Sequence, residues 1–137
     1  MFPQISIKGN PEVYKNRILN FINAFADAVF LDSNNGTAQH IPITGVRYNF
    51  IAAAGISDVI HADHNNLEQL QHFIEISQVK KEWVFGFLSY DFKNELENLT
   101  SVNPDHTGFP LFHFFSARHV FIATNDDLTI IDDEDPD

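Results

Sequence analysis

The chain has 137 residues, 44% of them hydrophobic and 14 of them phenylalanine, which is enough for one domain with a core built from large rings. It has no cysteine, which excludes disulfides, thiol nucleophiles and cysteine-based zinc or iron–sulfur sites. Its net charge of −11 argues against binding to nucleic acid or to an anionic membrane surface, because both need a basic face.

The acidic charge is concentrated at the C-terminal end. Seven of the 19 acidic residues lie between 126 and 137, and the rest of the chain has a net charge of only −4. We therefore expect a domain over 1–125, followed over 126–137 by an acidic exit segment or linker rather than by a metal-binding tail. No apolar run approaches the roughly 20 residues that span a bilayer. The N-terminus does not resemble a signal peptide, so the cytoplasm is the expected compartment.

Two amphipathic helices are predicted in the first 80 residues. Asn10 is a suitable cap and Pro11 a suitable first residue for one helix, whose apolar stripe continues to about Ala26. Asn65 or Asn66 is expected to cap the second helix. The predicted inner face of this second helix consists of Leu67, Leu70, Phe73, Ile74 and Ser77.

The remaining segments read mainly as strands. Residues 28–33 predict a short buried strand, and the Asn-Asn-Gly at 34–36 predicts a turn before an irregular loop at 37–45. Residues 46–55 alternate like a strand, and we expect residues 57–63 to pair with them in a hairpin about Gly55.

The C-terminal half predicts a central strand over 82–90, a short helix over 91–99 and a loop over 103–110. Residues 111–124 and 128–132 predict a terminal strand pair. Because hairpin-like connections dominate, the expected fold is α+β with a largely antiparallel sheet. The terminal pair is apolar on both faces, so we expect another domain to cover its second face.

The stretch EWVFGFLSYDFKNELENL, residues 82–99, contains three residues for which we expect structural roles. Gly86 would let a neighbouring backbone approach the strand closely. Tyr90 is expected to bury its ring. Asp91 is expected to cap the short helix by accepting from the amide of Lys93 or Asn94, so that Asp91→Ala would cost about 1 kcal/mol.

Candidate chemistry is sparse. The spacing of His61, Asp63 and His64 suits a metal site, but no distant further ligand can be named. Two other histidines, His113 and His119, lie six residues apart in a predicted strand, where packed or solvated histidines are common. Glu95 and Glu97 diverge on a helix, whereas acid–base catalysis needs converging carboxyls. We therefore expect no catalytic residue and no metal ligand in this chain.

Three segments together resemble a known family. VFLDSN (29–34), VRYNFIAA (46–53) and WVFGFLSYDFKNELENL (83–99) are similar to the N-terminal region of anthranilate synthase component I and, more closely, of para-aminobenzoate (aminodeoxychorismate) synthase component I. The resemblance covers most of the chain. It implies a part of the β-sandwich of the chorismate-utilising synthase fold.

The resemblance implies that the full enzyme aminates chorismate for folate synthesis, with magnesium and with ammonia from a glutamine amidotransferase partner. The chorismate and magnesium residues of the family lie in a larger C-terminal chorismate-binding domain, which this chain does not contain. The chain is therefore expected to pack against that domain, to need no cofactor of its own and to be inactive by itself.

Some members of this family hold tryptophan in their N-terminal region, at a Leu-Leu-Glu-Ser motif. Here Leu31, Asp32 and Ser33 occupy the last three positions, with an aspartate one methylene shorter than the glutamate, and Arg47 and Tyr48 match a second element. The resemblance thus implies a possible pocket in which Ser33 and backbone groups hold an amino acid and Tyr48 stacks on its ring. The alternative is that Ser33 merely begins the turn at 34–36.

Three functions remain open from the sequence. The first is the non-catalytic N-terminal domain of para-aminobenzoate synthase component I. The second is the same domain of anthranilate synthase component I, with tryptophan feedback, which the shorter Asp32 disfavours. The third is a stand-alone domain that binds a small molecule.

Overall fold

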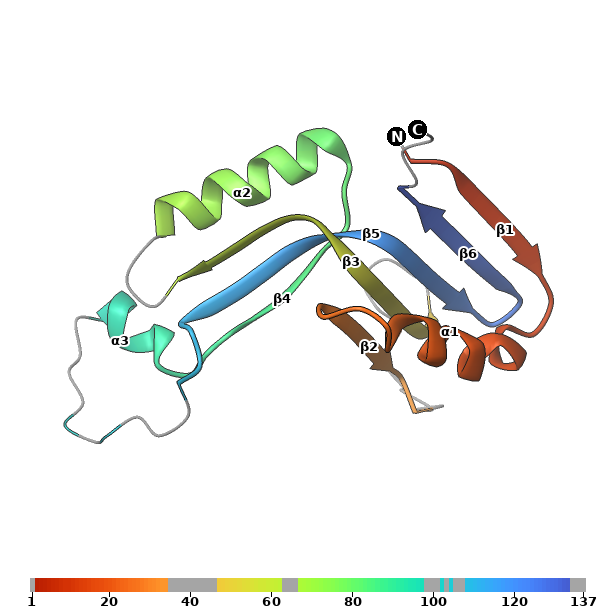
Figure 1. Cartoon of the computed structure of the whole chain (residues 1–137), viewed down its shortest axis with the longest axis horizontal. Coiled ribbons are helices and arrows are strands. Elements are labelled where there is room, and N and C mark those ends of the chain that lie inside the picture. Colours follow the sequence, from red (N-terminus) through yellow and green to blue (C-terminus); the bar gives the residue numbers. More distant parts are fainter. Residues whose placement is uncertain are drawn as a thin grey trace. The chain divides into compact units, whose positions relative to one another are not determined.

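A computed structural model describes residues 2–34, 47–62, 67–97 and 108–133, together with Val102 and Pro104 (Figure 1). The fold is α+β. Its elements in chain order are β1 (Gln4–Lys8), the 3₁₀ helix η1 (Pro11–Tyr14), α1 (Lys15–Ile22), β2 (Ala28–Asp32), β3 (Tyr48–Ala62), α2 (Leu67–Lys80), β4 (Val84–Leu88), α3 (Phe92–Glu97), β5 (Phe112–Thr124) and β6 (Asp127–Asp132).

The strands of the described residues form one open sheet of six in the order β1–β6–β5–β3–β2, with β4 paired to β5. The pairs β1–β6, β2–β3, β4–β5 and β5–β6 are antiparallel. The expected α+β class with a largely antiparallel sheet is therefore confirmed, while its membership in the chorismate-utilising synthase fold remains a prediction.

The chain divides into two compact units. Unit 1 comprises residues 1–56 and 117–137, and unit 2 comprises residues 57–116, so that β3 and β5 each contribute residues to both. Strand β6 lies between β1 and β5 in the sheet. The folded part of unit 1 thus extends past residue 125, where the exit segment was expected to begin, and residues 134–137 lie outside the described part of the chain.

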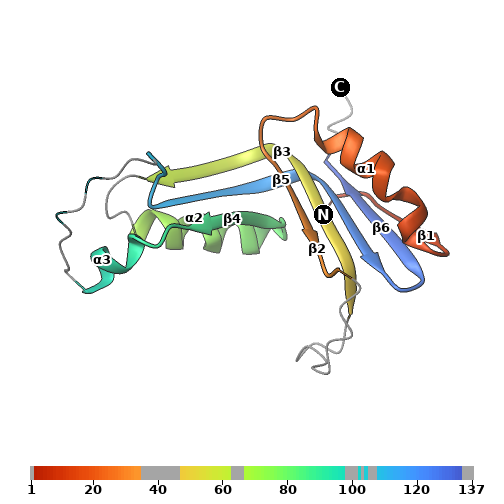
Figure 2. The same cartoon turned by 90° about the horizontal axis from the view of Figure 1, so that it is seen from below.

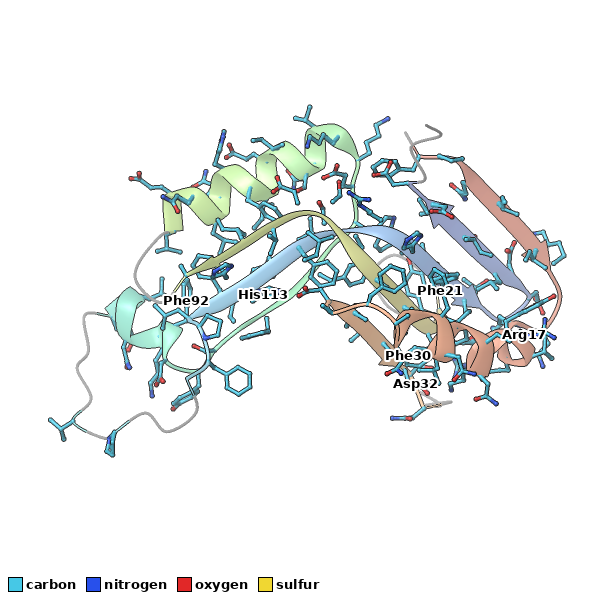
Figure 3. All side chains as sticks on the ribbon, viewed as in Figure 1. Arg17, Phe21, Phe30, Asp32, Phe92 and His113 are labelled. Carbon is cyan, nitrogen blue, oxygen red and sulfur yellow. The ribbon has the colours of Figure 1, made fainter. Side chains whose placement is uncertain are left out.

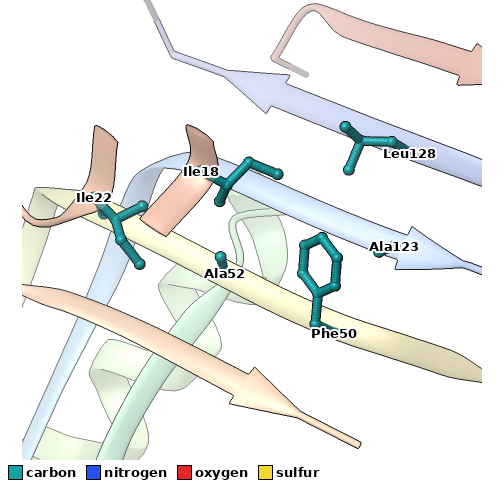
Figure 4. Close-up of a cluster of buried hydrophobic side chains, with 7 residues drawn as sticks. Ile18, Ile22, Phe50, Ala52, Ala123 and Leu128 are labelled. Carbon is teal, nitrogen blue, oxygen red and sulfur yellow. The ribbon is translucent and has the colours of Figure 1, made fainter. Parts of the chain in front are cut away.

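The core of unit 1 forms where α1 packs on the sheet (Figure 4). Ile18 and Ile22, four residues apart and therefore on one face of α1, are each 5% exposed. They pack with Phe50, Ala52, Ala54, Ala123 and Leu128. Figure 2 shows α1 running along the β5–β6 part of the sheet. Small alanine side chains on β3 and β5 let the helix approach the strands, so the isoleucines can bury their full side chains.

The first predicted helix is confirmed, with changes at both of its ends. Its first turn is the 3₁₀ helix η1, which begins at Pro11, and α1 ends at Ile22 rather than near Ala26. Asn10 caps it as expected, because the Asn10 Oδ1 atom accepts from the Glu12 amide at 3.0 Å.

Strand β1 has no counterpart in the sequence-based prediction. It pairs with β6 from Gln4↔Ile131 to Lys8↔Asp127. Asp127 accepts from the Lys8 ammonium and, at 2.8 Å, from the Ser6 hydroxyl, and these contacts hold the pKa of Asp127 below its ordinary value. The sequence of β1, Gln-Ile-Ser-Ile-Lys, alternates polar and apolar residues as half-buried strands do, so a local signal for this strand was present in the sequence.

The predicted hairpin about Gly55 is wrong. Strand β3 continues through Gly55, which has a φ of +74° and donates its amide to the Asp27 carbonyl at 3.1 Å. A glycine with positive φ can interrupt the regular geometry of a strand without reversing the chain. This part of β3 pairs antiparallel with β2, from Ala28↔Ala54 to Asp32↔Phe50, and β5 is the other neighbour of β3 in the sheet.

Strand β2 lies at the end of the sheet order, which corrects the prediction that it is buried. Leu31 is 53% exposed, and Val29 and Phe30 are only half-buried. An end strand has a neighbour on one side only, so its side chains lose less surface to packing. The predicted loop at 37–45 and most of the turn before it lie outside the described residues.

Unit 2 contains the second predicted helix, α2, which is confirmed. Leu70, Phe73 and Ser77 of its predicted inner face are buried, whereas Leu67 and Ile74 are each 36% exposed. The candidate caps Asn65 and Asn66 lie outside the described residues. The strand expected to be central is β4, which among the described strands pairs with β5 alone, so that prediction is wrong. Its apolar residues suit a central strand, yet Phe87 is 39% and Leu88 52% exposed, because an outer strand leaves apolar side chains uncovered.

Gly86 of β4 lies against β5. A Cβ atom placed on Gly86 would lie 2.1 Å from the His113 carbonyl oxygen and 2.7 Å from the Phe114 Cα, so only glycine fits this approach. Tyr90, in contrast, is 79% exposed, which contradicts its expected burial. The Lys93 ammonium lies 3.8 Å from the centre of the Tyr90 ring, so the ring is covered by a cation rather than by the core.

Asp91 does not cap α3 as expected. Within the described residues its carboxylate makes no hydrogen bond. The amides of the first turn are instead satisfied by backbone carbonyls, with Lys93 N donating to Tyr90 O at 3.3 Å and Asn94 N donating to Asp91 O at 2.9 Å. The turn that leads into the helix thus removes the need for a side-chain cap.

We expect Asn10→Ala to lower the free energy of unfolding by about 1 kcal/mol, because it removes the acceptor for the Glu12 amide at the start of η1. Chemical denaturation monitored by circular dichroism would measure the loss. Asp91→Ala is the matched control and should change stability by much less. Equal losses in the two variants would contradict this description of the two helix starts.

Candidate functional site

Four of the five residues that the resemblance assigns to an amino-acid pocket lie together. Leu31, Asp32, Ser33 and Tyr48 line a cavity of about 230 Å³, which we call the β2–β3 pocket. The pocket is completed by Asn49, Phe50 and Ile51. The antiparallel pairing produces it, since the end of β2 lies beside the start of β3 and the Ser33 amide donates to the Asn49 carbonyl at 2.9 Å.

Arg47, the fifth residue, is exposed immediately before β3 and is not among the residues that line this pocket. Tyr48 is half-buried, which leaves part of its ring accessible. The pocket therefore offers an apolar wall, the Ser33 hydroxyl and the Asp32 carboxylate. Among the described residues that line it, it lacks the Arg47 guanidinium that the family resemblance implies.

Asp32 is held by structural contacts (Figure 3). Its carboxylate accepts from the Lys15 ammonium at 2.6 Å and from the Asn34 amide at 2.9 Å. Both contacts, the Lys15 one first, lower the pKa of Asp32, and the same ion pair raises the pKa of Lys15. Lys15 also lies 5.9 Å from the ring centres of Phe30 and Phe50. A ligand at this pocket would thus meet a carboxylate whose charge is already balanced.

We expect Lys15→Gln to raise the pKa of Asp32 toward its ordinary value of 3.8, because the main contact that stabilises the carboxylate is lost. Since the folded-state pKa is depressed in the native protein, the ion pair stabilises the fold above the unfolded-state pKa and ceases to do so as pH falls through the folded-state value. The two proteins should therefore differ in stability near neutral pH and converge in acid.

A carbon-detected NMR titration of the Asp32 carboxyl group would measure this change. Lys81→Gln, which removes an exposed cation from unit 2, is the matched control and should leave the pKa of Asp32 unchanged. An Asp32 pKa that is the same with and without Lys15 would show that the ion pair does not persist in solution.

Two further cavities were not predicted. One, of about 330 Å³, lies in unit 1 between α1 and strands β1, β5 and β6, and includes Arg17, His119 and Asp132. The other, of about 390 Å³, lies in unit 2 and is lined by Phe87, Ser89, Tyr90, Asp91 and Phe109. The residues of the first come from five separate elements, so no local sequence signal could have found them. The second includes Tyr90, which the sequence predicted to be buried but which is exposed.

Among the described histidines, His61, His113 and His119 contact other rings, whereas His72 is exposed on α2. The His119 ring lies 5.2 Å from the rings of both Phe21 and Phe25, and its Nδ1 is 2.9 Å from Asp132 Oδ1. The His61 and His113 rings stack at 6.1 Å. Among the described residues no three His, Asp or Glu side chains converge as a metal site requires. Asp63, His64 and the side chain of Glu95 lie outside them.

No protein-family model matches the chain, and no curated protein matches it. The family resemblance therefore stays a prediction from the sequence segments quoted above. No helix in the described residues is long and apolar enough to cross a membrane.

Proposed function

We propose that the chain is the non-catalytic N-terminal domain of a para-aminobenzoate synthase component I, whose full enzyme aminates chorismate to aminodeoxychorismate for folate synthesis. One observation carries the proposal. Leu31, Asp32, Ser33 and Tyr48, which the family resemblance assigns to one pocket from two separate segments, line the same cavity. An incidental resemblance in two short segments would not require them to meet.

The contacts around this pocket favour a binding or packing role over a reactive one. Asp32 is held in place by Lys15 and the Asn34 amide, and these contacts lower its pKa, so its carboxylate is a weaker base than an unpaired aspartate. In the proposal, chorismate and magnesium bind in the C-terminal chorismate-binding domain, and ammonia comes from a glutamine amidotransferase partner.

The exposure of β2 supports a second domain as the partner of this surface. Leu31 is 53% exposed beside the open pocket, at the end of the sheet. Exposed apolar side chains at such a position are suited to burial against another protein surface. We propose that the chorismate-binding domain covers this position.

The test mixes this chain with a separately produced chorismate-binding domain of a para-aminobenzoate synthase component I. We expect a complex in analytical ultracentrifugation, and we expect aminodeoxychorismate from chorismate, magnesium and ammonia only when the chorismate-binding domain is present. Leu31→Asp should weaken the complex, whereas Val13→Asp, at a 69% exposed site on η1, should not. Turnover by the chain alone, or no association, would contradict the proposal.

The product and the effector separate the alternatives. Formation of anthranilate by the assembled enzyme would place the chain in the anthranilate branch instead. Calorimetry with millimolar tryptophan provides a second test, because heat that is lost in Ser33→Ala would favour either that branch or a stand-alone binding domain. No heat would count against both.

A further inference from the structure

The cavity of about 330 Å³ in unit 1 is separate from the β2–β3 pocket, and the described residues that line the two cavities are all different. Ile18 and Ile22 pack α1 against β3 and β5 and against Leu128 of β6. Because of this packing, an open groove remains between the outer edge of α1 and the neighbouring strands β6 and β1. We call it the Arg17 groove.

The walls of the groove are largely apolar, with an aromatic side. Ile7, Leu128 and Ile130 line it from β1 and β6, and Tyr14, Phe21 and Phe121 supply the rings. Phe21 meets Phe121 edge-on, with ring centres 5.7 Å apart, yet it is still 43% exposed. A planar ring placed in the groove would therefore contact aromatic and aliphatic groups and cover an exposed phenylalanine.

The charged groups of the groove are unequal in their availability. Asp132 lies opposite His119 across the β5–β6 pair, and its Oδ1 atom is 2.9 Å from the Nδ1 atom of His119. Arg17 is exposed on α1, four residues before Phe21 and so on the same face of the helix (Figure 3). Among the described residues Arg17 has no hydrogen-bond or ion-pair partner. The groove thus combines apolar walls with one available guanidinium.

We propose that the Arg17 groove binds a small aromatic carboxylate, with the ring against Phe21 and Phe121 and the carboxylate paired with the Arg17 guanidinium. A planar guanidinium offers two parallel N–H donors that match a carboxylate. The Asp132 charge and the net charge of −11 disfavour multiply charged anions such as phosphate esters. The volume is at the lower end of ligand pockets, which run from about 300 to 1,000 Å³, and suits a single ring rather than a protein segment.

The test is a titration of the ¹⁵N-labelled chain, followed by amide NMR shifts, with three probes that share one ring. Phenylacetate should bind saturably and shift amides of α1, β5 and β6 in unit 1. Phenylacetamide, which is neutral, should bind at least about tenfold more weakly, and phenethylamine, which is cationic, more weakly still. Equal binding of the three probes would overturn the assignment of a carboxylate.

Two variants test the residues. Arg17→Gln should weaken phenylacetate binding about tenfold or more and leave phenylacetamide binding unchanged. Phe121→Leu should weaken both, because it removes an aromatic wall. Lys81→Gln is the matched control, since it removes an exposed cation from unit 2 and should change neither. Unchanged phenylacetate binding in Arg17→Gln would overturn the proposal.

Three other results would also overturn it. The first is the absence of any saturable shift, and the second is a set of shifts centred on the β2–β3 pocket. The third is a shift of the same groove amides when the protein is diluted without a ligand. That result would identify a second copy of the chain as the occupant. The inference does not depend on the proposed domain function, because the titration needs neither chorismate nor a second domain. Failure of one test therefore leaves the other intact.

Discussion

Phe50→Ala is expected to lower the free energy of unfolding by about 3–5 kcal/mol, the range for removing a large buried ring. Phe50 is 1% exposed, stacks on Phe30 at 5.2 Å with an interplanar angle of 21°, and packs with Ile18 and Ile22 in the core of unit 1. Alanine would lose these contacts and leave a cavity between α1 and β3. Urea denaturation followed by circular dichroism would measure the change.

Phe109→Ala is the matched control for this substitution. Phe109 is 65% exposed and meets the ring of Phe87 edge-on at 5.9 Å, so its loss should cost less than about 1 kcal/mol. Phe50→Leu should recover most of the stability, because it refills much of the cavity. A cost for Phe50→Ala no larger than that for Phe109→Ala would mean that the described core of unit 1 is wrong.

Phe50 also lines the β2–β3 pocket, which links the fold to the candidate site. The ring is fixed between β2 and α1, and Lys15 lies beside it while holding Asp32. The shape of the pocket therefore depends on how α1 docks. Loss of ligand or domain binding in Phe50→Ala would reflect disordered packing, so Ser33→Ala and Leu31→Asp are the better probes of the pocket itself.

Local signals explain which elements could be predicted. Asn10 and Pro11 mark a helix start through capping and a fixed φ, both of which act within a few residues. The 14-residue helix α2 and the strand pair β5–β6, with its turn at Asn125 and Asp126, likewise carry their patterns within themselves. The α+β class followed from these elements.

The predictions were wrong where one local sequence pattern fits two different arrangements of the chain. Gly55 with positive φ suits both a hairpin turn and an irregularity within one strand, and the choice depended on β2 pairing with β3. The apolar residues of β4 suit a central or an outer strand. Tyr90 follows an apolar run, but Lys93 on the next turn of chain covers its ring in place of the core.

The candidate sites divide in the same way. Leu31, Asp32, Ser33 and Tyr48 could be named from sequence because they lie in two compact segments with a family resemblance. The ion pair of Asp32 with Lys15 could not, because Lys15 belongs to α1 and meets β2 only through packing. The Arg17 groove draws on β1, η1, α1, β5 and β6, so its residues are related only by the fold.

Gly86→Ala is expected to lower the free energy of unfolding by about 2–3 kcal/mol, because it overpacks the contact between β4 and β5. A Cβ atom at Gly86 would lie 2.1 Å from the His113 carbonyl oxygen, 2.5 Å from Phe114 Cδ1 and 2.7 Å from Phe114 Cα. Two of these three atoms belong to backbone, so a side-chain rotation alone cannot relieve the clash and the two strands must separate. The stabilisation that Gly→Ala gives through the unfolded chain, about 0.4–1 kcal/mol, is too small to compensate.

Gly108→Ala separates this clash from the conformational cost of replacing a glycine. Gly108 has a φ of +62°, and a Cβ atom placed on it would meet no described residue within 4 Å, so alanine there should cost only about 1–2 kcal/mol, from backbone strain. Hydrogen exchange adds a spatial test. In Gly86→Ala, protection should fall at 84–88 and 112–116 in unit 2, where Gly86 pairs with Phe114, and persist in the β1–β6 pair of unit 1. A loss spread evenly over both units would mean that they unfold as one, so that the strain at Gly86 is borne by the whole sheet.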